Sequence, residues 1–208
     1  MSIELWFAFV VSSAVLLVIP GPTILTVISY SIAHGRRANV PLVAAVALGD
    51  STALALSLLG LGALLATSAL WFATVKLVGG LYLLYLGAKL LRTGISSSEL
   101  PLPKVPSSLW RLFANTYLVT ALNPKGMVFF VAFLPQFINP NAGVTQQLWV
   151  LAVTFVVLAI FNAMFYAVFA ALARRVLSSP NAQRGFNIAG GSLLSAAGLW
   201  ALLARRPA

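Results

Sequence analysis

Cysteine is absent from this chain of 208 residues, and acidic residues are scarce, since Asp and Glu together number 3. Without cysteine the chain can form neither disulfides nor thiolate metal sites, and the sequence leaves its redox compartment open. Charged residues make up 8% of the chain, whereas roughly 25% is usual for a soluble domain. This scarcity of charge argues against a soluble protein.

Long apolar runs dominate instead. The chain is 61% hydrophobic, with a mean hydropathy of +0.99, and about 20 helical residues suffice to cross a bilayer core. Six stretches reach that length, at about residues 5–30, 40–66, 70–91, 112–134, 148–172 and 186–204. The sequence therefore predicts an all-α integral membrane protein with six transmembrane helices in a single domain, 1–208.

The net charge of +10 is distributed unevenly among the connections between these spans. The first, third and fifth connections carry Arg36, Arg37, Arg92, Lys104, Arg111, Arg174, Arg175 and Arg184, whereas the second and fourth carry no charge. Because basic residues favour cytoplasmic loops, both termini are expected outside (N-out/C-out). The basic tail at Arg205-Arg206 would then lie outside, which disagrees mildly with this orientation. No soluble basic face with interleaved aromatics remains, so nucleic acid is not an expected partner.

The two halves of the chain carry related features at a nearly constant separation. Gly79, Gly80 and Gly87 recur as Gly190, Gly191 and Gly198, and Asp50 in the second span corresponds to Asn162 in the fifth. With three spans per half, the second copy must insert upside down, which predicts an inverted repeat of two three-helix halves. Repeat 1 covers about 1–92, a Ser- and Pro-rich cytoplasmic linker about 93–111, and repeat 2 about 112–208. The glycines also fit close helix packing in lipid.

Two spans are interrupted near their middles. Pro20-Gly21-Pro22 breaks the first span, and Asn123-Pro124-Lys125 breaks the fourth. Asn is a favoured helix cap and Pro a favoured first helical residue, so a helix is expected to begin after each break. The freed backbone groups must face protein or water, and each helix N-terminus favours an anion such as a carboxylate. Paired interruptions indicate a transporter's binding site, although a simple proline kink is the alternative for each.

Two ionisable residues fall within the predicted membrane core, Asp50 and Lys125. A charge at that depth costs at least roughly 2.5 to 3.5 kcal/mol, and such residues usually pair or line a pathway. The two could form a structural ion pair. Alternatively, Asp50, the one acid in the core, could carry a proton or bind a substrate ammonium group.

Other classes of function find little support. A metal or small-cation exporter is the alternative function, but one acid without cysteine or an intramembrane histidine is a poor ligand set. No nucleophile or acid/base constellation suggests an enzyme, and no cofactor is expected.

Four motifs carry a family resemblance: VIPGPTIL (18–25), HGRRAN (34–39), GGLYLLYLGAKLLR (79–92) and NPKGMVFFVAFLPQF (123–137). Together they resemble the lysine exporter and homoserine/threonine efflux (LysE/RhtB) family of bacterial amino-acid exporters, over nearly the whole chain. The resemblance implies proton-driven efflux of amino acids across the bacterial inner membrane by a multi-pass homodimer. The first loop, 37–41, departs from the family in lacking further glycines.

An amino-acid zwitterion needs an anion site and a cation site close together. The helix N-termini with Lys125 would bind the carboxylate, and Asp50 would bind the ammonium and couple transport to protons. The predicted substrate-binding residues are Pro20, Gly21, Pro22, Thr23, Asp50, Asn123, Pro124, Lys125 and Asn162, with Thr120 as a further polar side chain near the break. The expected mechanism is secondary active antiport, in which one repeat rocks against the other.

Overall fold

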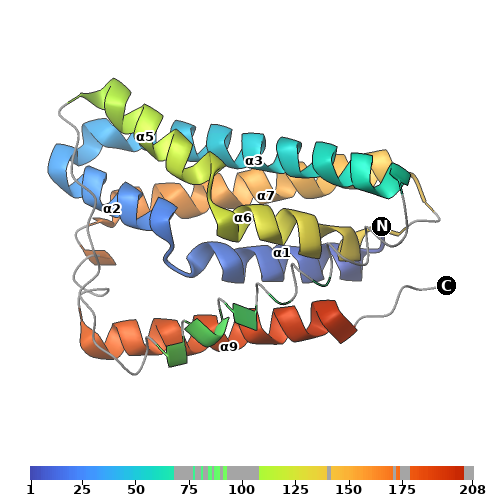
Figure 1. Cartoon of the computed structure of the whole chain (residues 1–208). Helices are drawn as coiled ribbons and strands as arrows, with labels where there is room; N and C mark the ends of the chain where they lie inside the picture. The colour runs from blue at the N-terminus through green and yellow to red at the C-terminus, as the bar shows by residue number, and fades with distance from the viewer. Residues whose placement is uncertain are drawn as a thin grey trace.

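The computed structural model describes residues 1–67, 77, 81, 84–85, 87–89, 91–92, 108–139, 142–170, 172–173 and 179–203. Within these residues the chain forms a bundle of helices, without any strand. Figure 1 shows the long helices lying roughly along one common direction. The N-terminus and the end of α9 lie at the right of that view, and the turn from α2 to α3 lies at the left.

The first half of the chain contains a broken helix followed by a long one. Helix α1 spans Ile3–Val18, and α2 begins at Pro22 and ends at His34. A single 3-10 turn, η1, Gly35–Ala38, leads into α3, Asn39–Thr67. Gly35 makes this turn possible because its φ of 64° lies in the left-handed region that favours glycine.

The second half repeats this pattern with a shorter interruption. Helix α5 spans Leu109–Ala121, and α6 spans Pro124–Val128. The helix continues through a π-helical segment, η2, Phe129–Phe133, and a 3-10 turn, η3, Leu134–Phe137. Two long helices follow, α7 at Val144–Val168 and α9 at Pro180–Leu203. The expected breaks in the first and fourth spans are therefore confirmed.

Among the described residues, three helical stretches are long and apolar enough to cross a membrane: Pro22–Gly60, Leu109–Phe137 and Val144–Val168. Helix α1 is apolar but shorter. The third predicted span, 70–91, lies mostly outside the described residues, as do Gly79, Gly80 and the linker from 93 to 107. The six-span count, the inverted repeat and the orientation thus stay predictions, while the all-helical class is confirmed.

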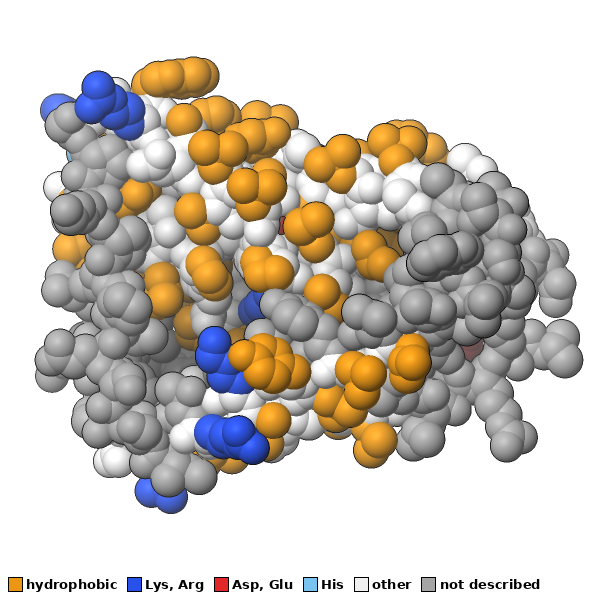
Figure 2. Space-filling view, viewed as in Figure 1, with side chains coloured by type: hydrophobic (Ala, Val, Ile, Leu, Met, Phe, Trp, Pro, Cys, Tyr) orange, Lys and Arg blue, Asp and Glu red, His pale blue; other side chains and the backbone are white. Residues whose placement is uncertain are grey.

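The surface carries the apolar side chains expected of a protein in lipid. Large hydrophobic residues such as Trp149, Phe161 and Phe165 are more than half exposed, at 69%, 66% and 60%. Figure 2 shows hydrophobic side chains spread over most of the described surface on the visible face. The Lys and Arg side chains on that face lie in its left half. Because a bilayer solvates apolar side chains, such exposure carries no penalty there.

Helix α3 packs against both α5 and α7, and α1 packs against α7 and α9. Phenylalanine rings fill the space between α1, the η2–η3 segment and α7. The ring centroids of Phe130 and Phe155 lie 4.7 Å apart, and those of Phe9 and Phe137 lie 5.3 Å apart, both in edge-to-face arrangements. These contacts join the second half of the broken fourth span to α1 and α7.

Glycines allow helices to approach closely, as the sequence predicted. A Cβ at Gly87 would lie 2.7 Å from the carbonyl oxygen of Gly191, and one at Gly191 would lie 2.8 Å from that of Gly87. These two glycines therefore form a seam between α9 and the predicted third span, so the packing role is confirmed for this pair.

The Gly49→Ala substitution is expected to lower the free energy of unfolding by about 1 to 3 kcal/mol, as overpacking in a tight seam does. The new Cβ would lie 2.6 Å from Cβ of Thr120 and 3.0 Å from the backbone oxygen of Tyr117 on α5, neither of which can swing away. Denaturant unfolding in detergent micelles measures the change. Gly60→Ala on the same helix is the control, because a Cβ there meets nothing within 4 Å. Equal stability of the two variants would contradict the prediction.

Candidate functional site

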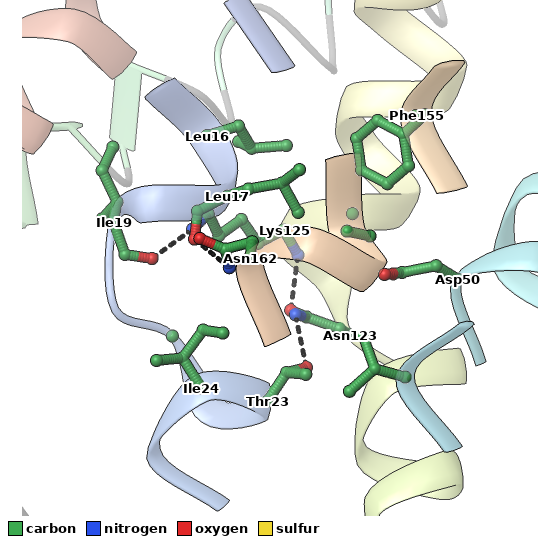
Figure 3. A pocket seen from close by; sticks show the side chains of 14 residues that line it. Leu16, Leu17, Ile19, Thr23, Ile24, Asp50, Asn123, Lys125, Phe155 and Asn162 are labelled. Carbon is green, nitrogen blue, oxygen red and sulfur yellow. Dashed lines mark hydrogen bonds between the residues drawn. The ribbon is translucent and has the colours of Figure 1, made fainter. Parts of the chain in front are cut away.

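The two helix breaks meet at one small cavity in the centre of the bundle (Figure 3). The polar side chains that line it belong to Thr23, Asp50, Asn123, Lys125 and Asn162, and the rest of the lining includes Gly21, Leu16, Val46, Phe155 and Ala159. The volume is about 40 Å³, which is room for a few water molecules. This volume is smaller than that of an amino acid.

Each break begins a helix that starts inside the bundle. Gly21 is the cap of α2 and Asn123 the cap of α6, with Pro22 and Pro124 at the first turns. The Oδ1 atom of Asn123 accepts a hydrogen bond of 3.1 Å from the backbone N–H of Lys125. Such a bond satisfies one of the free donors of a helix N-terminus, as predicted from the motif.

A hydrogen bond links the two breaks directly. The side-chain amide of Asn123 donates to Oγ1 of Thr23, at 3.2 Å. Thr23 lies in the first turn of α2, so the N-terminal ends of α2 and α6 are held beside each other. Their positive dipole ends therefore lie at the same cavity, where they favour a negative group.

The C-terminal end of α1 also reaches this cavity, and its free carbonyl groups need donors. The carbonyl oxygens of Leu17, Val18 and Ile19 each accept one bond from a side chain of the second half. The donors are Asn162 Nδ2 at 3.1 Å, the Tyr166 hydroxyl at 2.9 Å and Lys125 Nζ at 2.7 Å, respectively. Side chains of α6 and α7 thus donate the hydrogen bonds that these carbonyl groups need and that lipid cannot provide.

Asp50 faces the cavity from α3 and is buried, with 7% of its surface exposed. Asp50 forms no hydrogen bond and no ion pair with any other described residue. Lys125 directs its ammonium group to Ile19 instead, although the two opposite charges attract each other across the cavity. The direct Asp50–Lys125 pair that the sequence allowed is therefore not formed in this arrangement.

Most of the predicted site residues come together. Gly21, Thr23, Asp50, Asn123, Lys125 and Asn162 all line the cavity. The prolines Pro20, Pro22 and Pro124 lie in the breaks without lining it, and they act through the backbone by removing N–H donors.

Thr120 does not belong to the cavity, so the prediction that it completes the site is wrong. It is buried in the seam between α5 and α3, where its Cβ adjoins Gly49 and its Oγ1 donates to the Thr116 carbonyl at 2.8 Å. A threonine can satisfy its hydroxyl on its own helix, so a polar side chain near a break need not face the cavity.

Sequence reasoning missed Tyr166, whose hydroxyl binds the end of α1. Asn162 and Tyr166 are four residues apart on α7, which places them on the same helix face. Two polar groups at this spacing in an otherwise apolar span could have indicated that Tyr166 faces the same side as Asn162. Among the described residues, no cluster of His, Asp and Glu is placed to hold a metal ion.

Comparison with known proteins gives a consistent result. Residues 14–205 match the family model described as LysE type translocator. A homoserine/homoserine lactone efflux protein of Salmonella typhimurium is 33% identical over 204 residues, which cover 98% of each chain. A leucine efflux protein of Salmonella choleraesuis is 29% identical over 143 residues, covering 67% of this chain and 68% of the relative.

A protein of Vibrio cholerae described as an uncharacterized membrane protein is 30% identical over 203 residues, covering 96% of this chain and 97% of the relative. No solved structure matches the chain.

Proposed function

The chain belongs to the LysE type translocator family, and from that premise we propose that it exports amino acids from the cytoplasm by proton-coupled antiport. It is a membrane transporter and not an enzyme. The similar proteins are named for efflux of homoserine, homoserine lactone and leucine. Amino acids are therefore the substrate class with the strongest support.

The meeting of the two helix breaks at one charged cavity carries this proposal. The N-termini of α2 and α6 and the Lys125 ammonium group offer positive charge for a carboxylate. Asp50 offers negative charge for an ammonium group in the same cavity. A zwitterion with one charge of each sign matches both ends of this site, whereas a simple ion matches only one.

Alternating access is the mechanism we propose for moving the substrate. The cavity of about 40 Å³ is too small for an amino acid, and in this mechanism it widens as the two halves rock apart on one side and then on the other. Asp50 would exchange its proton during this cycle. The basic connections would face the cytoplasm in the bacterial inner membrane, and the protein would work as a homodimer with both termini outside.

The proposal is tested with purified protein in liposomes and a panel of labelled amino acids, with and without a pH gradient. Counterflow of at least one amino acid is expected, together with uphill movement when a pH gradient of the correct direction is imposed. Liposomes without protein serve as the control. A flat response to every amino acid would refute amino-acid export, and transport that ignores the pH gradient would refute proton coupling alone.

A further inference from the structure

The end of α1 is bound by three donors that differ in kind. Asn162 and Tyr166 are neutral, and both project from α7. Lys125 is cationic and reaches the Ile19 carbonyl on a four-carbon side chain. Its stem passes Gly21, where an added Cβ would lie 3.7 Å from Cδ of Lys125. The contact with Ile19 is thus made by the side chain that has the most rotatable bonds of the three.

Lys125 also has the most to gain from a new partner. The bond from the Lys125 ammonium group to the Ile19 carbonyl is already charge-assisted, and a carboxylate would add the attraction between two full opposite charges. A substrate carboxylate entering the cavity can therefore displace the neutral Ile19 carbonyl as the partner of Lys125. Asn162 and Tyr166 carry no full charge and lack this attraction between charges, so they remain on Leu17 and Val18.

Once released, the Ile19 carbonyl needs another donor. Ile19 and Asp50 both line the cavity, and Figure 3 shows them on opposite sides of Lys125 and Asn162. A substrate ammonium group that enters the cavity can donate to the released carbonyl oxygen. Backbone carbonyls at broken helices commonly bind cations in transporters. The exchange would leave no polar group of the break unpaired.

We propose that Lys125 and the Ile19 carbonyl form an exchangeable pair at the transport site, and that Tyr166 is a positioning residue that holds α1 in place for the exchange. This inference rests on the proposed function. Tyr166 binds the carbonyl of Val18, the residue next to Ile19. An ammonium group has three donors, so without the tyrosine hydroxyl Lys125 would have two neighbouring carbonyls to satisfy. The substrate carboxylate would then compete less well for it.

The Tyr166→Phe variant tests this role. It removes one hydroxyl and keeps the ring, which is packed in the hydrophobic core. The KM for the exported amino acid is expected to rise about 2- to 12-fold, the usual effect of one hydrogen bond. The turnover number is expected to stay within about twofold of the wild type, since the hydroxyl serves the binding of substrate and not the later rocking step.

Tyr117→Phe is the matched control. The hydroxyl groups of Tyr117 and Thr52 lie 3.2 Å apart and join α5 to α3 outside the cavity. This control is expected to keep the wild-type KM. A loss of melting temperature and turnover in Tyr166→Phe at unchanged KM would assign Tyr166 a purely structural role and overturn the inference. A wild-type KM at full turnover would overturn it as well, whereas a wild-type protein that exports no amino acid would overturn the proposed function together with it.

Discussion

The Asp50→Asn variant is expected to fold and insert like the wild type but to lose export driven by a pH gradient. Asparagine has nearly the same shape and cannot exchange a proton. No described residue donates a hydrogen bond to the Asp50 carboxylate, which is buried at the cavity, so the change removes no hydrogen bond among them. Uphill export is expected to fall by about tenfold or more, because the variant exchanges no proton and the substrate ammonium group loses its charge-assisted hydrogen bond to the carboxylate.

Export by this variant is measured in liposomes against the amount of folded protein, which is determined by size-exclusion chromatography. Ser51→Ala is the control at the neighbouring position, because Ser51 donates to the Ala47 carbonyl of its own helix, at 2.7 Å. The control should transport normally. Uphill export by Asp50→Asn at the wild-type rate would remove Asp50 from the coupling step and leave it the role of a buried structural charge.

Replacing the other charge of the cavity is expected to affect recognition of the substrate. Lys125→Met keeps much of the side-chain volume and removes the ammonium group. The affinity for the amino acid is expected to fall about 10- to 100-fold, because the carboxylate loses a charge-assisted hydrogen bond. Titration of the purified protein with a labelled amino acid measures this loss. Some loss of stability is also expected, since the Ile19 carbonyl loses its donor.

An analogue separates recognition from stability. An amide of the same amino acid lacks the carboxylate, so Lys125→Met should bind it no worse than the wild type does. Lys89→Met is the matched control, because Lys89 is an exposed lysine outside the cavity. If Lys125→Met binds the amino acid with wild-type affinity, the ammonium group of Lys125 has no part in binding the carboxylate.

The site also explains how the break between α1 and α2 is stabilised in a membrane. Free carbonyls at the end of α1 would be costly in lipid, and they are bound by side chains from α6 and α7. The donors come from the other half of the chain, so the contacts that stabilise the break also join the two halves. A movement of one half against the other must therefore change at least some of them.

Much of this architecture could be predicted from local sequence. Pro cannot donate a backbone hydrogen bond, and Asn before Pro is a strong helix start, so the positions of both breaks followed from residue chemistry alone. The membrane class followed from the apolar runs. The pairing of Asp50 and Asn162 as equivalent positions also predicted two residues that the structure places at one cavity.

The orientation of side chains could not be predicted in the same way. In a soluble helix the polar face marks the solvent side, but in a membrane both lipid and protein core are apolar, so the pattern that identifies the inner face is weak. Thr120 was predicted to complete the site because it lies near the break in sequence, but it packs into the seam between α5 and α3 instead. Tyr166 is one of many aromatic residues in the sequence, and its residue type alone did not single it out, but its hydroxyl binds the end of α1.

The sequence by itself therefore determined the membrane class, the two helix breaks and the presence of two opposite charges in the predicted membrane core, because these depend on composition and on local backbone chemistry. Only the tertiary structure decided that Lys125 binds the Ile19 carbonyl while Asp50 has no hydrogen bond or ion pair with another described residue. Both choices depend on how α1, α3, α6 and α7 pack around the cavity. Two opposite charges in one sequence have several possible partners, and the distances fixed by packing select among them.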